Sequence, residues 1–290
     1  MTTPTVAVTG STGRLGGRVA RRLAAAGVPQ LLVVRDPARA PSLDASQVAA
    51  ADYGDPGAGR SALAGVQTLF MVSGSETPDR VDQHGTFVDA AAAAGVEHLV
   101  YLSFYGAGPD ATFTLARDHW ATEEHIRSCG LRWTFLRDNL YLDFFPAMVG
   151  EDGMIRGPAG DGRVAAVAQD DIADVATAVL RDPPAHAANT YDLTGPEALS
   201  MSDVADQLSW ATERVVGYIP ETLDDAYRSR AHYGAPAWQV DAWVSTYTAI
   251  AAGELAEPTD TVQRIAGHPP ASLADLLLKR AGDVRLGSPL

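Results

Sequence analysis

Short apolar segments alternate with segments of helical periodicity along the first half of the chain. The apolar segments predict strands at residues 6–8, 30–35, 47–51, 67–72, 96–103 and 131–137. The intervening segments predict helices, among them 81–94, which would end at Gly95, and 116–128. Because parallel strands need crossover connections, six strands in this alternation predict an α/β fold with a Rossmann-type doubly wound parallel sheet.

The pattern changes beyond residue 139. Residues 150–162 are rich in Gly and Asp and predict a loop or short hairpin, whereas 189–193 predicts one more strand that returns to the sheet. A helix is expected at 170–180, with Asp170 or Asp171 as its cap. Helical patterns dominate after residue 200, at 202–212, 223–230, 237–252 and 273–280.

Three spaced glycines join the first predicted strand to the helix that follows it. Residues 5–16 read T-V-A-V-T-G-S-T-G-R-L-G. In this context the first glycine permits a tight turn, the second lets the backbone approach a pyrophosphate, and the third lets helix and strand pack closely. The segment predicts a dinucleotide site, the alternative being a glycine turn that serves packing alone. The expected cofactor contacts here are Gly10, Ser11, Thr12, Gly13, Arg14, Leu15 and Gly16.

The ends of the next strands predict which nucleotide binds. Arg35 ends the second strand, where an arginine favours the 2'-phosphate, and Arg39 follows one helical turn later. We therefore expect NADP(H), with NAD(H) as the alternative if Asp36 rather than Arg35 meets the ribose. The other interpretation of Asp36 is an Asp-Pro turn. Further cofactor contacts are expected from Asp52, Ser73, Gly74 and Ser75, although turn chemistry alone also favours these residue types.

These motifs divide the chain into two expected domains. Residues 1–195 would form an NAD(P)-binding Rossmann domain with a loop excursion at about 141–163. Residues 196–290 would form a smaller, mostly helical substrate-binding lobe. The crevice between this lobe and the carboxyl ends of the strands is the default ligand site of such folds.

Composition narrows the class of partner. The 290 residues carry a formal net charge of -14 and no basic stretch, which argues against direct binding of nucleic acid. The single Cys129 excludes an internal disulfide, no leader pattern precedes the first strand, and no apolar run suits a membrane helix. We expect a cytoplasmic monomer or homodimer without a metal site, because the seven histidines show no metal-ligand spacing.

The expected catalytic helix lacks the usual proton donor. Short-chain dehydrogenases place Tyr-x-x-x-Lys on the helix after the fifth strand and a serine near that strand's end. Ser103 fits the serine position, but if His119 takes the lysine position, Leu115 stands where the tyrosine should be. His119 could hold the ribose or relay a proton, or it could make only an ordinary hydrogen bond.

Short segments in order along nearly the whole chain resemble the NmrA-like group of atypical short-chain dehydrogenases. These segments are V-T-G-S-T-G-R-L-G-G at 8–17, A-D-Y-G-D at 51–55, V-S-G-S-E at 72–76, D-Q-H at 82–84, R-D-H-W-A-T-E at 117–123, L-R-D-N-L-Y at 136–141, A-G-D-G-R at 159–163 and I-A-G-H-P-P at 265–270. Within the group the resemblance is greatest to bacterial type-2 NAD(P)H:quinone oxidoreductases. It implies NADPH and the reduction of quinones or similar conjugated acceptors.

Residues just past the sixth strand are the expected substrate contacts. Asn139 offers a donor and an acceptor, and Tyr141 offers an aromatic wall with a hydroxyl. An apolar slot for a flat ring could be completed by Phe104, Tyr105, Phe144, Phe145 and Trp238, unless these are core residues. The catalytic candidates are thus His119, Ser103, Asn139 and Tyr141.

The main hypothesis is an NADPH-dependent oxidoreductase that transfers hydride to a quinone-like acceptor, because such acceptors need no dedicated tyrosine. Two alternatives stay open. The missing tyrosine and lysine also fit a non-catalytic NADP(H)-sensing regulator that acts through a protein partner. The same scaffold would serve a ketoreductase or related reductase of secondary metabolism.

Overall fold

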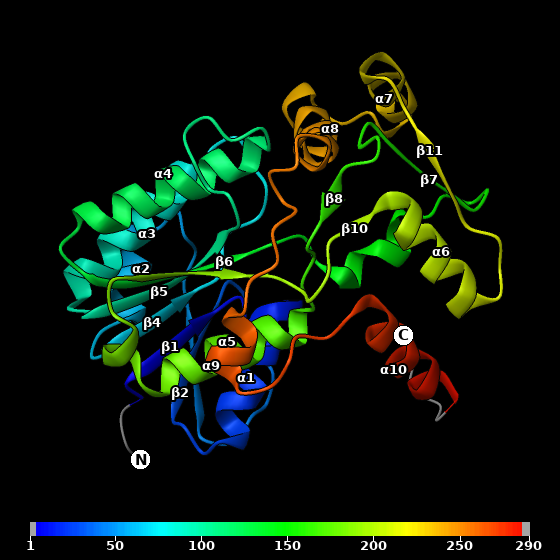
Figure 1. Cartoon of the computed structure of the whole chain (residues 1–290). Coiled ribbons are helices and arrows are strands. Elements are labelled where there is room, and N and C mark those ends of the chain that lie inside the picture. The colour runs from blue at the N-terminus through cyan, green and yellow to red at the C-terminus, as the bar shows by residue number, and fades with distance from the viewer. Residues whose placement is uncertain (1–3, 286–290) are drawn as a thin grey trace. The chain divides into compact units, whose positions relative to one another are not determined.

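A seven-stranded sheet organises the first part of the protein (Figure 1). The structure is a computed structural model that describes residues 4–285, with side chains described up to residue 279. The strands are β1 (Val6–Thr9), β2 (Gln30–Val34), β3 (Ser46–Ala50), β4 (Thr68–Met71), β5 (His98–Phe104), β6 (Arg132–Asp138) and β9 (Asn189–Leu193). Their order is β3-β2-β1-β4-β5-β6-β9, with parallel pairing from β3 through β6. The predicted doubly wound Rossmann-type sheet is confirmed.

The strand order reverses at β1, which pairs with β2 on one side and β4 on the other. Val6 is in register with Gln30 of β2 and with Thr68 of β4. Ligands of doubly wound folds bind at the carboxyl ends of the strands beside such a reversal. The glycine segment leaves β1 at this point.

Helices cover both faces of the sheet. Figure 1 shows α2 (Pro56–Ala62), α3 (Arg80–Ala94) and α4 (Thr114–Ser128) on one face, with α1 (Arg14–Ala25) and α5 (Gln169–Arg181) on the other. α3 ends at Gly95, as predicted, because this residue adopts the left-handed conformation at φ +87°. Fully buried apolar side chains from strands and helices form the core, including Leu69, Phe87, Leu99, Ile126 and Phe135.

The described chain divides into two compact units. The first contains residues 4–109, 117–138 and 172–192, and the second contains 110–116, 139–171 and 193–285. The segment 139–171, which the sequence suggested was partly a loop excursion of the Rossmann domain, thus groups with the C-terminal residues. The domain boundary at residue 195 stays a prediction about independently folding parts.

The second unit is mostly helical, as expected for the C-terminal part. It contains α6 (Met201–Thr212), α7 (Leu223–Arg230), α8 (Ala237–Ala251), α9 (Thr261–Ala266) and α10 (Leu273–Arg285). It also holds two small sheets: β7 (Met154–Gly157) pairs parallel with β11 (Gly217–Pro220), and β8 (Arg163–Val164) pairs antiparallel with β10 (Leu199–Ser200). The predicted loop or hairpin at 150–162 is therefore wrong in part, because β7 finds its partner about sixty residues away in sequence.

Short 3-10 helices complete the described elements, at Pro37–Arg39, Leu142–Met148, Pro183–His186 and Ala231–Tyr233. The second of these carries the residue that caps α5. Asp143 accepts the hydrogen bond of the Gln169 amide at 2.9 Å. The expected cap residues lie in the first turn of α5, where Asp171 also accepts from the Ala271 amide at 2.8 Å and Asp170 pairs with Lys279 at 3.1 Å.

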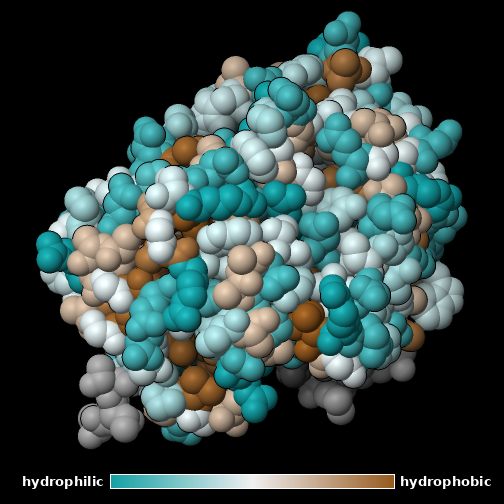
Figure 2. Space-filling model, turned by 60° about the vertical axis from the view of Figure 1, so that its left-hand side comes forward, coloured by the Kyte–Doolittle hydropathy of each residue, from teal (hydrophilic) through white to brown (hydrophobic). Residues whose placement is uncertain are grey.

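Hydrophilic residues cover most of the face drawn in Figure 2, and the hydrophobic areas between them are small and separate. Among residues 4–285, no helix combines the length and the apolar character that crossing a bilayer requires.

Candidate functional site

The glycine segment forms a tight turn between β1 and α1. Gly10 adopts φ +64°, and its carbonyl accepts the hydrogen bond of the Gly13 amide at 2.8 Å. At Gly16 an added Cβ would lie only 2.4 Å from the Gly10 carbonyl oxygen, so no side chain fits there without movement of the turn. The first and third glycines therefore have the conformational and packing roles that the sequence suggested.

The N-terminus of α1 is suited to an anion. Gly13 is its N-cap, no side chain caps the helix, and the first turn contains no acidic residue. Ser11, which is 2% exposed, has a hydroxyl without a hydrogen-bond partner among the described residues. A buried hydroxyl without a partner is unfavourable, and a phosphate oxygen would supply that partner.

The other predicted loop residues differ in what they can offer. Thr12 and Arg14 are exposed at the start of α1, whereas the Leu15 side chain is buried. Thr12 and Arg14 can therefore contact a ligand with side chains, and Leu15 only with its backbone.

The structure distinguishes Arg35 from Asp36. Arg35 is exposed directly after β2, and Arg39 is exposed in the short helix that follows. The Asp36 carboxylate instead accepts from the Ala38 amide at 3.0 Å and caps that helix. This local bond is the Asp-Pro turn considered in the sequence, and it engages the Asp36 carboxylate with the backbone, although Asp36 is exposed like the two arginines.

Tyr53 links the ends of β1 and β4. Its hydroxyl lies 2.6 Å from both the Val72 carbonyl oxygen and the Thr9 hydroxyl, and the Val72 amide donates to Thr9 Oγ1 at 2.9 Å. Burial raises the pKa of Tyr53, so it stays a neutral donor. The neighbouring Asp52 is exposed and accepts from the Gly54 amide at 3.0 Å. Sequence analysis missed Tyr53, although it lies within the quoted A-D-Y-G-D segment.

The segment after β4 is fixed by His84 of α3. The Gly74 amide donates to His84 Nε2 at 2.8 Å, and a Cβ on Gly74 would lie 3.2 Å from this nitrogen. Ser73 is half-buried and Ser75 is exposed. His84 thus holds the backbone at Gly74, the middle one of the three predicted contact positions.

Around His119 lies a buried network of five polar side chains, which we call the histidine network: Arg80, His84, Tyr101, His119 and Thr122. Arg80 Nη2 lies 3.0 Å from His119 Nε2, and Tyr101 Oη lies 3.0 Å from His119 Nδ1. His84 Nδ1 lies 2.9 Å from Thr122 Oγ1, which donates in turn to the Asp118 carbonyl at 2.9 Å. The strand β5 and the helices α3 and α4 supply these residues.

The donors of the network decide the state of both imidazoles. An arginine can only donate, so His119 Nε2 must accept and the ring proton lies on Nδ1. The Gly74 amide likewise makes His84 Nε2 an acceptor and places that proton on Nδ1, where it is donated to Thr122. Burial, assisted by the charge of Arg80, lowers the pKa of His84 to about 3 and that of His119 well below its ordinary value. Both imidazoles are therefore neutral at pH 7.

Ser103 belongs to a second buried cluster. Its hydroxyl donates to Glu123 Oε1 at 2.6 Å, and Arg137 binds both oxygens of this fully buried carboxylate at 2.8 and 2.6 Å. Arg127 donates to Glu123 Oε2 at 3.1 Å and lies over the Phe135 ring. The proton of Ser103 is therefore engaged with Glu123 in this structure.

The candidates that follow β6 lie in the second unit. Asn139 is fully buried, its amide nitrogen donates to the Leu255 carbonyl at 3.0 Å, and its oxygen accepts from the Leu140 amide at 2.8 Å. Tyr141 stacks on Phe144 with ring centroids 6.0 Å apart, and Phe144 is 48% exposed. The pair presents partly exposed aromatic surface, whereas Asn139 ties its own segment to Leu255.

The remaining aromatic candidates differ in exposure. Phe104 and Phe145 are buried, and Tyr105 and Trp238 are half-buried. In the first unit, the Phe104 ring centroid lies 6.2 Å from that of His119, beside the histidine network.

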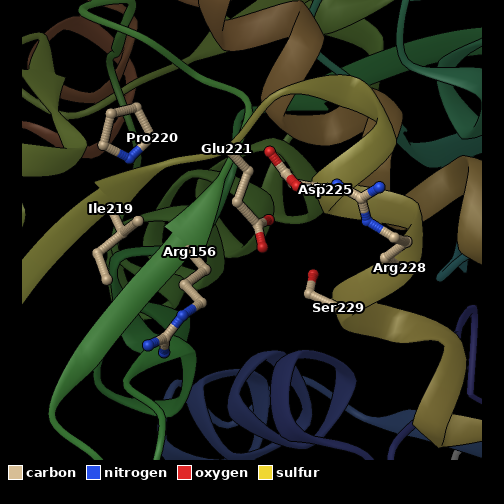
Figure 3. Close-up of a pocket in the computed structure, with 7 residues that line it drawn as sticks. All are labelled: Arg156, Ile219, Pro220, Glu221, Asp225, Arg228 and Ser229. Carbon is tan, nitrogen blue, oxygen red and sulfur yellow. Dashed lines mark hydrogen bonds and ion pairs between the residues drawn. The ribbon is translucent and has the colours of Figure 1, made fainter.

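A pocket of about 430 Å³ lies within the second unit (Figure 3). It is lined by Arg156, Ile219, Pro220, Glu221, Asp225, Arg228 and Ser229. Its charged groups are already paired: Glu221 with Arg230 at 2.9 Å, Arg228 with Asp225, and Arg156 with Asp152. The pocket therefore offers a ligand no unpaired charge among these lining residues.

Asp89, His125 and Cys129 bring one ligand atom each within 4.8 Å of one another on α3 and at the end of α4. Asp89 Oδ1 lies 2.8 Å from His125 Nε2 and 3.5 Å from Cys129 Sγ, so the groups satisfy one another. The expectation that no histidine binds a metal stays a prediction.

The chain belongs to the NmrA-like family, whose model matches residues 2–228. It is 34% identical over 275 residues to an NAD(P)H azoreductase of Xenophilus azovorans, covering 93% of this chain and 96% of that one. It is 32% identical to quinone oxidoreductase 2 of Escherichia coli K12, with the same coverage of 93% and 96%.

Solved structures agree with this assignment. The E. coli quinone oxidoreductase 2 complexed with NADPH has a TM-score of 0.87 at 31% identity, covering 95% of this chain and 99% of that one. A Citrobacter triphenylmethane reductase complexed with NADP(H) has a TM-score of 0.84 at 31% identity, with coverage of 95% and 99%. The resemblance inferred from the sequence motifs is confirmed.

Proposed function

We propose that the protein is an NADPH-dependent oxidoreductase that reduces a quinone or a similar conjugated acceptor. The observation that carries this proposal is the turn at Gly10–Gly16, where an acid-free helix N-terminus meets the buried hydroxyl of Ser11, for which residues 4–285 provide no hydrogen-bond partner. These features fit a pyrophosphate. Bound NADPH would supply the hydride.

The chain's own residues would then divide the work of binding. The amides of the glycine turn, Ser11 and Arg14 would hold the pyrophosphate, and Arg35 with Arg39 would meet the 2'-phosphate. The segment Ser73–Ser75, held by His84 through Gly74, would line the nicotinamide half. Asp52 would accept from the adenine amine.

Two observations support a conjugated acceptor. The relatives named above are an azoreductase, a quinone oxidoreductase and a triphenylmethane dye reductase, all of which act on conjugated molecules. In this chain Leu115 stands one helical turn before His119, where an alcohol dehydrogenase needs its tyrosine. A quinone gains aromatic character on reduction and has less need of such a donor. His119, Ser103, Asn139 and Tyr141 remain candidates near the reaction, with Tyr141 and Phe144 as a stacking surface.

The proposal also covers the location, the oligomeric state and the partners of the protein. We infer a cytoplasmic monomer or homodimer that acts on a small aromatic molecule. The net charge of -14 supports the absence of a nucleic-acid partner. The Rossmann domain of residues 1–195 and the substrate lobe of 196–290 would act together, although the compact units assign 139–171 to the second part.

The test is an anaerobic titration of the purified protein with NADPH and NADH, followed by 1,4-benzoquinone in the same cuvette. We expect tighter binding of NADPH and oxidation that depends on the protein. A panel of quinones, azo dyes and triphenylmethane dyes would extend the test. Tight binding without oxidation of NADPH by any acceptor would overturn the reductase proposal and favour an NADP(H)-sensing regulator.

A further inference from the structure

The histidine network contains a cation that nothing in the usual dehydrogenase pattern assigns. Arg80 is 4% exposed and lies at the first residue of α3. Its Nη2 lies 3.0 Å from His119 Nε2, its Nη1 lies 3.5 Å from Asp118, and its Nε is buried without a hydrogen-bond partner in the described part of the chain. Burying an arginine with so few partners lowers the stability of the fold, so Arg80 is expected to have a role that offsets this cost.

We propose that Arg80 is a positioning residue that holds His119 as a neutral imidazole with its proton on Nδ1, so that His119 is not the proton donor of the reaction. The inference deepens the proposed function and rests on it for the reaction itself. In this arrangement Arg80 supplies the fixed positive charge beside the position that a lysine occupies in the usual Tyr-x-x-x-Lys pair.

The hydrogen bonds of His119 leave it no ring nitrogen for a substrate. Nε2 accepts from Arg80, and the Nδ1 proton is donated to Tyr101 Oη at 3.0 Å. Tyr101 is fully buried, and its hydroxyl also lies 3.5 Å from His84 Nδ1. A second chain runs from the Gly74 amide through His84 to the Thr122 hydroxyl, which donates to the Asp118 carbonyl. The two chains approach each other at Tyr101 and His84 and fix both imidazoles relative to Gly74.

The charged and titratable groups around His119 favour its neutral form. On α3 these are Arg80 and His84, on β5 Tyr101, on β6 Arg137, and on α4 Asp118 and Glu123. The negative charge of Glu123 is bound by Arg137 and Arg127, and Asp118 faces Arg80. Burial and the nearby cations therefore dominate, and a proton on Nε2 would also clash with the donor of Arg80.

The proton balance of the reaction follows from this geometry. Two-electron reduction of a quinone takes up one hydride and one proton, the hydride with its electron pair from NADPH and the proton on the resulting oxyanion. Because both imidazoles are neutral and hydrogen-bonded, and because Ser103 donates to Glu123, none of these three side chains supplies that proton, which leaves water or the Tyr141 hydroxyl as its source.

The first test is spectroscopic and needs no turnover. Long-range 1H–15N spectra of the full chain labelled at histidine, assigned with His119→Asn, report the proton position of each imidazole. We expect His119 to be neutral with its proton on Nδ1 from pH 5.5 to 8. Arg80→Met should change this state, by moving the proton to Nε2 or by adding a second proton at low pH, and Arg80→Lys should retain it.

Arg132→Met is the matched control, because Arg132 forms an exposed pair with Glu97 at 2.7 Å in the same unit. A proton on His119 Nε2 in the parent protein, a charged His119 at pH 7, or an unchanged spectrum in a folded Arg80→Met protein would each overturn the proposal. If Arg80→Met fails to fold, the spectrum of the parent protein still tests the proposal, because it shows which nitrogen of His119 carries the proton.

The second test uses turnover. His119→Asn keeps a donor toward Tyr101 but cannot deliver a proton, so kcat with benzoquinone should fall by less than about tenfold, whereas loss of a general acid costs about 10²–10⁴ fold. A loss in that larger range would overturn the proposal. If the parent protein reduces no acceptor, the proposed function fails, and the spectroscopic test of Arg80 still stands.

Discussion

The hydroxyl of Ser103 donates to the carboxylate of Glu123 at 2.6 Å, within a cluster in which two arginines bind the same carboxylate. Ser103 is the last residue but one of β5, near the strand end where short-chain dehydrogenases use a serine to polarise a carbonyl. Here the serine completes the hydrogen bonding of a fully buried charge. The serine therefore occupies the expected position near the end of the strand, but its hydroxyl donates to another side chain of the protein.

The first prediction concerns the stability of this cluster. Glu123→Gln removes the carboxylate charge that Arg137 binds through both oxygens, while Arg127 keeps its pair with Glu124, and it should lower the free energy of unfolding by about 3–5 kcal/mol. Ser103→Ala removes one hydrogen bond to a charge and should cost about 1.5–3 kcal/mol. Urea denaturation of both variants measures the difference. Equal stabilities of Glu123→Gln and the parent protein would contradict the assignment of Glu123 as the centre of the cluster.

The second prediction separates binding from folding at Ser11. Because its hydroxyl is buried and has no hydrogen-bond partner in the described part of the chain, Ser11→Ala should leave the stability of the cofactor-free protein unchanged or higher. The same variant should weaken NADPH binding about tenfold, since it loses a hydrogen bond to a phosphate. Fluorescence titration and thermal unfolding measure the two effects. Thr12→Ala, at an exposed neighbouring position, is the comparison. Unchanged NADPH affinity in Ser11→Ala would exclude the hydroxyl from the site.

The third prediction concerns nucleotide choice. Arg35→Ala should weaken NADPH binding by about ten- to a hundredfold and leave NADH binding within about twofold, because only NADPH carries the 2'-phosphate. Asp36→Asn should affect neither nucleotide strongly, since this side chain caps the short helix Pro37–Arg39. Isothermal titration with both nucleotides gives the ratio. Equal losses of affinity for NADPH and NADH in Arg35→Ala would mean that Arg35 does not contact the 2'-phosphate.

The fourth prediction is a pH dependence of stability. Burial lowers the pKa of His84 to about 3 in the folded protein, whereas the unfolded chain titrates near pH 6.5. Below pH 6.5 the unfolded state binds a proton that the folded state excludes, so stability falls as pH falls toward 3. The titration of this one histidine should lower the free energy of unfolding by about 2 kcal/mol between neutral pH and pH 5. Denaturation at pH 7 and pH 5 should show a smaller difference in His84→Gln than in the parent protein. An unchanged pH dependence would mean that folding does not lower the pKa of His84.

Local patterns were sufficient for much of the fold. The elements β9 and α7 have the predicted bounds, 189–193 and 223–230, and α3 ends at the predicted Gly95. Each depends on its own residues, such as a glycine at a left-handed position or an apolar run between turns. The glycine turn and the family resemblance were predictable for the same reason, because each is a short contiguous segment.

The arrangement of the site could not be predicted from local sequence patterns alone. Arg80 and His84 follow β4 by about ten residues, Tyr101 lies on β5, and His119 and Thr122 lie on α4. Their hydrogen bonds join positions 17 to 39 residues apart. The quoted segment D-Q-H at 82–84 contained His84, but nothing in its spacing indicated that Gly74 and Thr122 would bind the ring.

The sequence by itself determined the parallel sheet, the glycine turn and the family, because the periodicity of side chains and the conformational freedom of glycine act over a few residues. Only the tertiary structure decided the state of the functional groups. Whether Ser103 donates to a substrate or to Glu123, and which nitrogen of His119 carries a proton, depends on donors and charges from other strands and helices. Packing brings these groups within 3 Å of one another and removes them from water.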